Sequence, residues 1–583
     1  MDLVFDIETD DLKATKVHCM VAQDYDSGKI YMFAPHQLEA GLELLQKADR
    51  LIGHNIIGFD VPVIKKLYGV DLSDIELVDT LIMSRLFNPV REGGHSLEMW
   101  GYRLKYPKKN FDEYEKYSSK MLDYCRRDVQ LNSLVLRELM KEGSGFSKES
   151  VQLEQEVSLI LKEQEDTGFL FDVYKSEILL AELREKMQAT EDEVHQVFKP
   201  RKVFEKILPS YKKDGSLSRL GFNETTNKKV HLLGSEYMLL TNGTPHFVRT
   251  HEEEFNLGSR KQIGEYLQDF GWKPARFTPT GQPIIDEGTL NKVTHIPEAK
   301  LIAEYLLLQK RVAQISSWIE AVEEDGRIHG FVISTGTITG RMSARSPNLQ
   351  QVPSVKSPYG AECRSCWIVP KDYKLVGIDA SGLELRMLAH YMKDKEFIDE
   401  IVNGDIHARN QKIAGLKSRS QSKSIIYAII YGAGNKKLGQ MVGGSTARGK
   451  KLRERLFADQ PAFKSLGDRV TQVAKRGYVK GLDGRRINIR RNYASLNSLL
   501  QGAGATIMKK ALLLLYEKGK KRNLDFKFVA NIHDEWQVEV HKAHAEYFGK
   551  LGIEAIKEAG NYYNLRCPLD AEYKIGDSWN DTH

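Results

Sequence analysis

The chain has 583 residues, of which 41% are hydrophobic and 28% are charged, and it contains no low-complexity run. This composition excludes an intrinsically disordered protein, and the length exceeds a single core, because a domain averages roughly 150 residues. The net charge of +6 is too small for a uniformly basic surface. We therefore expect a globular protein of several domains.

No segment predicts a membrane span or a secretory signal. The N-terminal sequence MDLVFDIETDDL is acidic and lacks the basic and long apolar regions of such a signal. The densest apolar stretch, SIIYAIIYGAG, is too short to cross a bilayer. We therefore expect a cytoplasmic protein that does not enter a membrane.

The five cysteines are an odd and sparse set, so we expect no disulfide framework. Cys363 and Cys366 form a CxxC pair. A structural zinc site needs further ligands at comparable spacing, and none stands nearby, so a metal or redox role for this pair is not favoured.

Residues 1–145 alternate short apolar strands with helical stretches, which is the pattern of an α/β domain. The predicted strands include LVFDI, HCMVAQDY, KIYMFA and RLIGHN, and one predicted helix is LEAGLELLQKA. Gly and Ser then cluster in residues 140–150, before a long amphipathic run from Val151 to Glu165. A domain boundary is expected there.

Four acids and a tyrosine in this first domain form a candidate metal site. Asp6 and Glu8 are two residues apart on a predicted strand, so both point to the same face. Asp60 begins a predicted helix, and Tyr124 and Asp128 lie one turn apart on another. Each acid alone is more often a surface residue, but together they offer the hard oxygen ligands that suit Mg²⁺ or Mn²⁺.

This ordered set resembles the DEDD superfamily of 3′-5′ exonucleases, in the subtype with a tyrosine in the third motif, and all five positions match. The resemblance implies a ribonuclease H-like domain whose four acids bind two metal ions. It also implies that Tyr124 orients the water that attacks the phosphodiester.

Residues 146–330 are predicted to be mostly helical, with an interruption at about residues 196–258 that is rich in Lys, Gly, Asn and Thr. Nine Lys or Arg and three acids fall within residues 199–229, so this segment matches the whole positive excess of the chain. A local basic segment favours contact with a polyanion or an acidic partner. The alternative is a solvated loop.

Two distant carboxylates end predicted strands in the C-terminal half. The apolar strand KLVGID ends at Asp379, and the predicted hairpin FKFVANIHDEWQVEV carries Asp534 at its tip, beside His533 and Glu535. An Asp at a strand end is often only a turn former. If the two strands are instead neighbours in one sheet, Asp379 and Asp534 can share two metal ions, as phosphoryl transfer requires.

The segment RSQSKSIIYAIIYG is predicted to be a helix. Arg419, Lys423, Tyr427 and Tyr431 recur every four residues and so lie along one slowly rotating face. The basic end suits a triphosphate, and the rings suit a sugar and a base. The alternative is a solvated basic end followed by core aromatics.

Together these motifs resemble family A DNA polymerases almost from end to end. DASGLELR, RSQSKSIIYAIIYG and HDE match motifs A, B and C of that family, with TGRMS and PNLQQVP upstream. GDIHARNQ, GLDGR and the domain order are most similar to the replicative polymerases of T-seven-like podophages. The resemblance implies a template-directed DNA polymerase with a proofreading exonuclease, which uses two Mg²⁺ ions at each site and replicates a phage genome.

The resemblance also implies a right-hand architecture after the exonuclease domain of residues 1–145. The thumb and linking helices would occupy residues 146–330, with the insertion at about 196–258. The palm would be formed by residues 331–405 and 521–583, with the fingers at residues 406–520 between its two parts.

The family further implies roles for single residues, with Asp379 and Asp534 as the metal ligands of the palm. The expected contacts of the incoming dNTP triphosphate are His407, Arg419 and Lys423, of which Lys423 would also protonate the leaving pyrophosphate. The residues expected to contact primer-template DNA are Arg341, Asn348, Gln501 and His533.

Three side chains are expected around the sugar and base of the incoming nucleotide. Tyr431 would lie at the nascent base pair, and Glu384 would pack with Tyr427 under the sugar, where a 2′-hydroxyl would clash. Many family members have Phe where this chain has Tyr427. The tyrosine predicts weak discrimination against dideoxynucleotides, because its hydroxyl can replace the missing 3′-hydroxyl.

In the phage relatives an insertion between thumb helices binds a processivity factor, thioredoxin in the best-known case. Residues 196–258 are shorter and do not match residue by residue, so the expected partner there is host thioredoxin, another factor or duplex DNA. A phage helicase-primase is a further expected partner. Among competing functions, Glu384 and the complete acid sets argue against an RNA polymerase and an inactive DNA-binding scaffold, whereas repair synthesis stays open.

Overall fold

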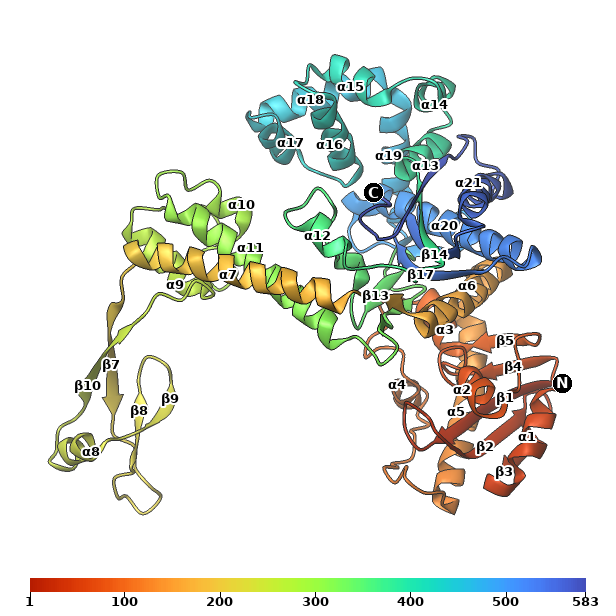
Figure 1. The fold of residues 1–583 in the computed structure, drawn as a ribbon, viewed down its shortest axis with the longest axis horizontal. Coiled ribbons are helices and arrows are strands. Elements are labelled where there is room, and N and C mark those ends of the chain that lie inside the picture. Colours follow the sequence, from red (N-terminus) through yellow and green to blue (C-terminus); the bar gives the residue numbers. More distant parts are fainter. The chain divides into compact units, whose positions relative to one another are not determined.

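A computed structural model describes all residues from 1 to 583. The chain forms two compact units, whose helices and strands are labelled in Figure 1. The first unit combines residues 1–173 with residues 321–583, and the second unit comprises residues 174–320.

The first unit begins with a five-stranded sheet in the order β3-β2-β1-β4-β5. β2 pairs antiparallel with β1 and β3, whereas β4 pairs parallel with β1 and β5. The strands are β1 (Asp2–Thr9), β2 (Val17–Asp24), β3 (Ile30–Phe33), β4 (Arg50–Gly53) and β5 (Glu76–Asp79). The first four strands were predicted from the sequence. β5 lacks a clear apolar signal, because two of its four residues are acids.

Helices cover both faces of this sheet (Figure 1). Leu3, Phe5 and Ile7 of β1 pack with apolar residues of α1 and α2, while Val4 packs with α3 and α5 on the opposite face, as strand alternation requires. The helical elements are η1 (Pro35–Gln37), α1 (Leu38–Leu45), α2 (Asp60–Tyr68), α3 (Thr80–Phe87), α4 (Leu97–Arg103), α5 (Ser119–Glu142) and η2 (Gly143–Gly145).

The helix α6 (Lys148–Thr167) connects this domain to the core of the C-terminal half. Ser147 caps its N-terminus by accepting a hydrogen bond from the Ser150 backbone N–H at 3.0 Å. The buried residues Leu153, Val157, Ile160 and Leu161 belong to the same hydrophobic cluster as the C-terminal sheet. The short strand β6 (Phe169–Leu170) follows and pairs with β11 (Arg327–Ile328).

The C-terminal sheet has four antiparallel strands in the order β17-β18-β14-β19. They are β14 (Tyr373–Ala380), β17 (Phe526–Ile532), β18 (Glu535–His541) and β19 (Ala571–Gly576). The helix α21 (Ala545–Tyr562) packs against β14 and β19, and α6 packs against β17. β14 is hydrogen-bonded to β18, so the predicted neighbourhood of the two distant strands is confirmed.

A mainly helical segment separates β14 from β17. Its helices are α13 (Leu383–Met392), α14 (Lys395–Val402), α15 (Ile406–Ala414), α16 (Arg419–Ile430), α17 (Asn435–Met441), α18 (Thr446–Asp459), α19 (Pro461–Ala474), η4 (Asn492–Ala494) and α20 (Ser495–Lys521). The small remaining elements of this unit are β12 (Phe331–Ile333), β13 (Ser343–Arg345), η3 (Leu349–Gln351), α12 (Gly360–Arg364), β15 (Tyr478–Lys480) and β16 (Arg486–Asn488).

The second unit contains a helical cluster and a four-stranded antiparallel sheet in the order β10-β7-β8-β9. The helices of the cluster are α7 (Val173–Val197), α9 (Arg260–Asp269), α10 (Glu287–Leu290) and α11 (Glu298–Glu320). The sheet consists of β7 (Arg201–Leu208), β8 (Leu220–Asn223), β9 (Lys228–His231) and β10 (Phe247–Glu253), with α8 (Gly234–Thr241) before the last strand. None of the helices of the protein combines the length and the apolarity needed to cross a bilayer.

Candidate active sites

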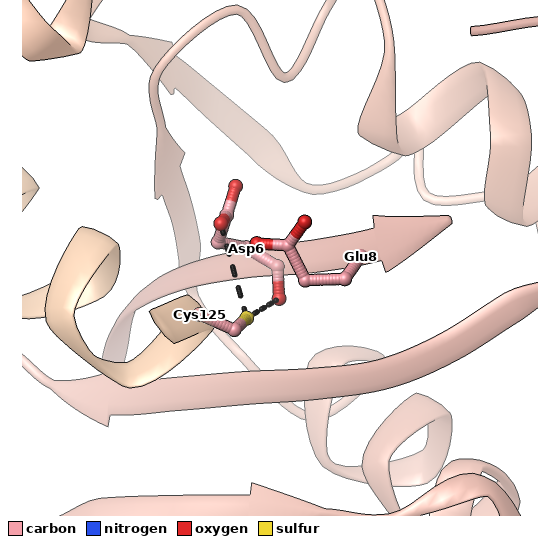
Figure 2. Close-up of side chains that lie close together, drawn as sticks. All are labelled: Asp6, Glu8 and Cys125. Carbon is pink, nitrogen blue, oxygen red and sulfur yellow. Dashed lines mark hydrogen bonds between the residues drawn. The ribbon is translucent and has the colours of Figure 1, made fainter. Parts of the chain in front are cut away.

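The acids of the first domain converge beside β1. Asp6 and Glu8 lie on this strand, and one carboxylate oxygen of each lies within 4.8 Å of the other and of the Cys125 sulfur (Figure 2). Asp60, the first residue of α2, accepts a hydrogen bond from the Ile7 backbone N–H at 3.2 Å. The strand and the helix start therefore bring three of the predicted acids together.

The helix α5 supplies the remaining residues of this cluster. Tyr124 and Asp128 are both buried on the helix face that meets the sheet. Between them, the Cys125 thiol donates to the backbone carbonyl of Asp6 at 3.3 Å, which fastens the helix to β1 (Figure 2). The Tyr124 ring stacks on Phe111 with the ring centroids 5.4 Å apart.

Burial and mutual repulsion raise the pKa values of these acids. Desolvation raises the pKa of Asp6 well above its usual value and that of Glu8 to about 9, and neighbouring carboxylates add to both shifts. Desolvation also raises the pKa of Asp60 to about 7 and raises that of Asp128. The Oδ1 atom of Asp128 is buried without a hydrogen-bond partner. A cluster of hard oxygen donors with an excess of negative charge fits divalent cations.

Lys108 lies against this cluster, in the loop between α4 and α5. Its ammonium is 2.5 Å from Asp128 Oδ2 and 4.8 Å from the centroid of the Tyr124 ring. Burial acts to lower the pKa of Lys108, but the attraction of the carboxylates, Asp128 first, outweighs burial and raises it. Sequence reasoning missed this residue, because a lysine in a polar loop next to another lysine carries no pattern.

The loop that leads to Asp60 is fixed by Asp79. The Asp79 carboxylate accepts hydrogen bonds from the backbone N–H groups of Asn55 at 3.0 Å and Ile57 at 3.2 Å. Gln155 of α6 makes two hydrogen bonds to the Asp79 backbone, accepting from its N–H at 3.1 Å and donating to its carbonyl at 3.2 Å. The helix α6 thereby supports the loop that positions Asp60.

The second carboxylate pair lies where β14 meets the β17–β18 hairpin. Asp379 is opposite Glu535 in the ladder, and the Ala380 N–H donates to the Asp534 carbonyl at 3.0 Å. Burial, followed by the Asp534 carboxylate, raises the pKa of Asp379 to about 7, and burial raises the pKa of Asp534. Two partly buried carboxylates that repel each other fit a divalent cation between them.

Glu535, which follows Asp534, is bound to the C-terminal segment instead. Its Oε1 accepts hydrogen bonds from Gln537 Nε2 at 2.6 Å and Trp579 Nε1 at 3.1 Å, and it lies 3.0 Å from His583 Nε2. The last residues of the chain therefore fix the start of β18. The sequence motif HDE does not by itself show that its two adjacent acids have different partners.

Three basic residues gather near the start of α16. Arg419 Nε is 2.6 Å from Asp405 Oδ2, and the same Asp405 carboxylate caps α15 by accepting from the His407 backbone N–H at 3.0 Å. Burial, followed by the charges of Arg419 and Lys423, lowers the pKa of His407. The Lys423 ammonium lies 6.0 Å from the centroid of the Tyr427 ring.

Glu384, in the first turn of α13, joins residues from two other segments. Arg341 Nη2 is 3.1 Å from Glu384 Oε1, and the Tyr431 hydroxyl donates to Oε2 at 2.8 Å. The Tyr427 ring centroid is 6.2 Å from that of Tyr431. Burial, followed by Glu384, raises the pKa of Tyr427 to about 12. Glu384 thus accepts hydrogen bonds from Arg341 and Tyr431, and the Tyr427 ring lies beside that of Tyr431.

The other predicted DNA contacts occupy different elements. Asn348 caps η3 by accepting a hydrogen bond from the Gln350 backbone N–H at 3.1 Å. His533 takes a left-handed φ of +57° in the turn beside Asp534, and Gln501 is partly buried on α20. Cys363 and Cys366 are both buried, and the Cys366 thiol donates to the Glu362 carbonyl at 3.4 Å.

Comparison with known proteins agrees with this arrangement. The sequence model of the family described as DNA polymerase family A matches residues 239–581, which is more than half of the chain. The chain belongs to DNA polymerase family A. The DNA-directed DNA polymerases of Enterobacteria phage T3 and Escherichia phage T7 are 34% and 33% identical to it, with 100% of both chains covered in each case. DNA polymerase I of Helicobacter pylori strain 26695 is 27% identical over 94% of this chain and 58% of its own length.

The polymerase also shares its fold with a solved structure, the POL domain of Pol1 from M. smegmatis in complex with DNA primer-template and dNTP. The TM-score is 0.80 at 19% identity, and the match covers 100% of this chain and 95% of that chain. These findings confirm the predicted family, the polymerase fold and the activity of a DNA-directed DNA polymerase. Polymerases of this family use divalent metal ions, in agreement with the carboxylates of Asp379 and Asp534, which lie within the matched residues.

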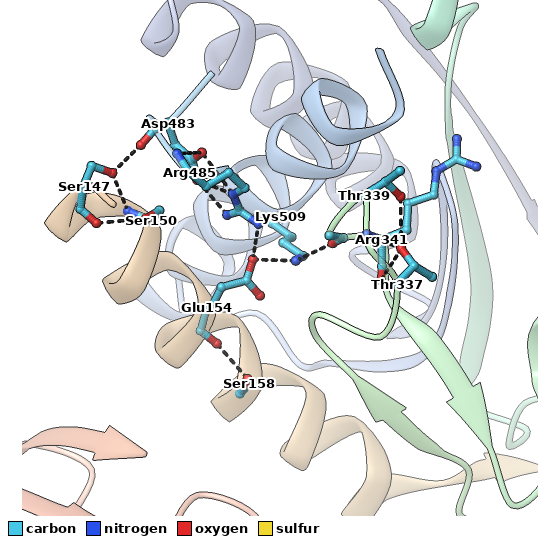
Figure 3. Close-up of polar contacts among 11 residues, drawn as sticks. Ser147, Ser150, Glu154, Ser158, Thr337, Thr339, Arg341, Asp483, Arg485 and Lys509 are labelled. Atoms are coloured by element: carbon cyan, nitrogen blue, oxygen red, sulfur yellow. Dashed lines mark hydrogen bonds and ion pairs between the residues drawn. The ribbon is translucent and has the colours of Figure 1, made fainter. Parts of the chain in front are cut away.

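Sequence reasoning also missed a buried charge cluster of the polymerase outside both acid sites. It consists of Glu154, Asp483, Arg485 and Lys509 (Figure 3). Glu154 and Lys509 are 355 positions apart in the sequence. No local pattern connects residues at such a separation, and only the packing of α6 against α20 brings them together.

Proposed function

We propose that the polymerase synthesises DNA in the 5′-3′ direction at Asp379 and Asp534 and proofreads in the 3′-5′ direction at the N-terminal acid cluster. The observation that carries this proposal is the presence of two separate clusters of carboxylates whose pKa values are raised by burial and repulsion. The similarity to phage polymerases along the whole chain supports a role in phage genome replication in the host cytoplasm.

At the exonuclease site, Asp6, Glu8, Asp60 and Asp128 would hold two Mg²⁺ ions, for which Mn²⁺ can substitute. When bound, such ions supply an activated water and stabilise the leaving oxygen of a phosphodiester. Tyr124 would orient the attacking water from its position one helical turn before Asp128. The unpartnered Asp128 Oδ1 supports its role as a ligand.

At the polymerase site, Asp379 and Asp534 would hold two Mg²⁺ ions beside the primer end. His407, Arg419 and Lys423 would bind the triphosphate, and Arg419 would exchange Asp405 for a phosphate oxygen. Lys423 would give a proton to the leaving pyrophosphate. These roles position the reactants and neutralise the charge that develops in the transition state.

The remaining side chains would recognise the nucleotide and the DNA. Glu384 and Tyr427 would line the sugar, and Tyr431 would contact the nascent base pair. Arg341, Asn348, Gln501 and His533 would contact the backbone and minor groove of the primer-template, which gives affinity without sequence preference.

Primer extension and primer degradation test the assignment of the two sites. We expect Asp534→Ala to abolish extension and keep degradation of single-stranded DNA, in Mg²⁺ or Mn²⁺. The paired variant Asp6→Ala with Glu8→Ala should do the reverse. Extension by the first variant, or degradation by the second, would show that the reaction is performed elsewhere in the chain.

The sheet of the second unit is the proposed docking site for a processivity partner, host thioredoxin or another factor, or for duplex DNA. Phe204 and Tyr211 are 65% and 64% exposed, and Leu233 and Met238 are 65% and 63% exposed. Phe204 lies on β7, whereas the other three lie in the segments that adjoin the strands, Met238 on α8. Large exposed apolar side chains on this sheet and its adjoining segments support a surface that is covered in the working complex. A helicase-primase of the phage is a further proposed partner of the replicating enzyme.

A further inference from the structure

Four charged side chains form a closed cluster outside both proposed metal sites (Figure 3). Glu154 lies on α6, Lys509 lies on α20, and Asp483 and Arg485 lie between β15 and β16. Each is between 0% and 3% exposed. Charged side chains are seldom buried unless they are paired, and here two cations balance two anions.

Most polar contacts of these four side chains are with one another. Glu154 Oε1 is 2.6 Å from Arg485 Nη1 and 2.5 Å from Lys509 Nζ. Arg485 also donates to Asp483 Oδ2 from Nε at 2.8 Å and from Nη2 at 2.6 Å. Lys509 differs, because its ammonium also donates to the backbone carbonyl of Gly340 at 2.8 Å. One donor of the cluster is therefore directed at a backbone group of another segment.

Gly340 lies in a tight turn between Thr337 and Arg341, both of which are labelled in Figure 3. Its N–H donates to the Thr337 carbonyl at 3.0 Å, and the Arg341 N–H donates to Thr337 Oγ1 at 3.1 Å. Gly340 has a φ of +78°, and a Cβ added there would lie 3.0 Å from Arg485 Nη1. The left-handed backbone and the close approach both favour glycine. The turn therefore has little freedom to move away from Lys509.

The residue after Gly340 contacts the nucleotide-selecting group of the proposed polymerase site. Arg341 Nη2 is 3.1 Å from Glu384 Oε1, and Glu384 Oε2 accepts the hydrogen bond of Tyr431. Lys509 thus binds the peptide group that links Gly340 to Arg341, and the side chain of Arg341 carries the guanidinium that contacts Glu384. The Lys509 ammonium contacts neither Glu384 nor Arg341, so any effect on the reaction passes through the turn.

We propose that Lys509 is a positioning residue of the polymerase site. It fixes the Gly340 carbonyl and, through the turn, directs Arg341 to Glu384, so that Glu384 keeps the position from which it excludes a ribose 2′-hydroxyl. Glu154 supplies the counter-charge that keeps the ammonium in place. This inference rests on the proposed roles of Arg341 and Glu384.

The test uses the full-length enzyme with a paired variant that keeps the buried charge balanced. Lys509→Met alone leaves Glu154 with an excess negative charge and is expected to destabilise the fold. Lys509→Met with Glu154→Gln removes one charge of each sign and also removes the donor to Gly340. The measured quantity is the ratio of kcat/KM for a dNTP to kcat/KM for the matching rNTP. A smaller fraction of active enzyme lowers both values equally and leaves this ratio unchanged.

We expect the paired variant to lower the ratio by about three- to ten-fold, the effect of one lost hydrogen bond. The matched control is Asp483→Asn with Arg485→Met, which removes the other half of the cluster and should leave the ratio unchanged. In an Arg341→Ala background the paired variant should not lower the ratio further, because Lys509 and Arg341 act through the same contact with Glu384.

Glu384→Ala separates this inference from the proposed function. If Glu384→Ala lowers the ratio but the paired variant does not, Lys509 has no positioning role, although the sugar-selecting role of Glu384 stands. If the control pair lowers the ratio as much as the paired variant, the cluster is only structural. If Glu384→Ala leaves the ratio unchanged, the proposed sugar selection is wrong and the inference is overturned with it.

Discussion

Lys108 and Lys109 are neighbours in the sequence, but the fold gives their charges different surroundings. Lys108 pairs with Asp128 of the acid cluster, and these side chains are 24% and 4% exposed. Lys109 pairs with Asp123, and these side chains are 48% and 36% exposed. A cation among buried carboxylates contributes more to stability than a cation in a solvated pair.

Replacement of each lysine by methionine measures this difference in the metal-free protein. In EDTA, Lys108→Met should lower the free energy of unfolding by about 2 kcal/mol, because it leaves buried carboxylates uncompensated. Lys109→Met should cost less than about 1 kcal/mol, as expected for an exposed pair. Urea denaturation measures both values. Equal decreases in the free energy of unfolding for the two variants would show that Lys108 does not compensate the charge of the acid cluster.

The raised pKa values predict how the stability of the metal-free protein depends on pH. The pKa values of Asp60 and Asp379 are about 7 and that of Glu8 is about 9 in the folded protein, whereas unfolded carboxyl groups titrate near pH 4. Between these values the three carboxyl groups bind more protons in the native state than in the unfolded state, so they lower the free energy of unfolding as the pH rises. The buried imidazoles of His54 and His95, whose pKa values burial lowers to about 3 and about 4, have the opposite effect below about pH 6.5.

Urea midpoints in EDTA should accordingly decrease from about pH 7 to about pH 9, where the buried histidines are neutral in both states. Saturating Mg²⁺ should reduce the decrease, because a bound cation stabilises the ionised carboxylates. The variant Asp6→Asn with Glu8→Gln should have a smaller decrease even without metal. A midpoint that rises over this range, or a variant with the wild-type slope, would contradict the assignment.

At the scale of elements, local patterns predicted which strands and helices carry most of the candidate site residues. The period of four in α16 and the alternation in β1 are local properties, so Lys423, Asp6 and their neighbours were assigned to the correct elements. The tertiary partners of Arg341 and Glu535 were not predictable. Each of these contacts depends on which distant segments pack together, and the periodicity of the sequence contains no information about that packing.

The sheet of the second unit can be removed at a defined place. β7 begins at Arg201 and β10 ends at Glu253, and these two residues are paired across the ladder. The two ends of the sheet are therefore adjacent, and a short Gly/Ser linker can replace residues 201–253. The helical cluster of the same unit, from α7, α9 and α11, has its own apolar core and should fold without the sheet.

This deletion should shorten the product made per DNA-binding event, because the proposed docking surface is lost, while the rate of single-nucleotide addition is kept. Product length is measured on a primed single-stranded template with a trap for dissociated enzyme, with and without added thioredoxin. A decrease only when thioredoxin is present identifies a protein partner. A decrease in both cases identifies direct DNA contact, and no decrease rejects both.

At the scale of the whole molecule, the two proposed reaction centres share one helix. Glu154 and Gln155 are consecutive residues of α6, and both are buried. Glu154 pairs with Lys509, which binds the turn before Arg341, whereas Gln155 binds the Asp79 backbone near the loop of Asp60. The sequence predicted α6 as an amphipathic run after a boundary, but not that its polar residues connect the two halves.

This shared helix limits how the enzyme can be divided into parts. A fragment that ends before α6 keeps all four carboxylates of the proposed exonuclease site but loses Gln155, so the Asp79 segment that supports the Asp60 loop is released. A polymerase fragment that begins after α6 loses Glu154 and leaves the buried Lys509 ammonium without its carboxylate partner. Chimeras with related polymerases therefore need to exchange α6 together with its partners on both sides. Neither half of the first unit is expected to fold correctly without a copy of this helix.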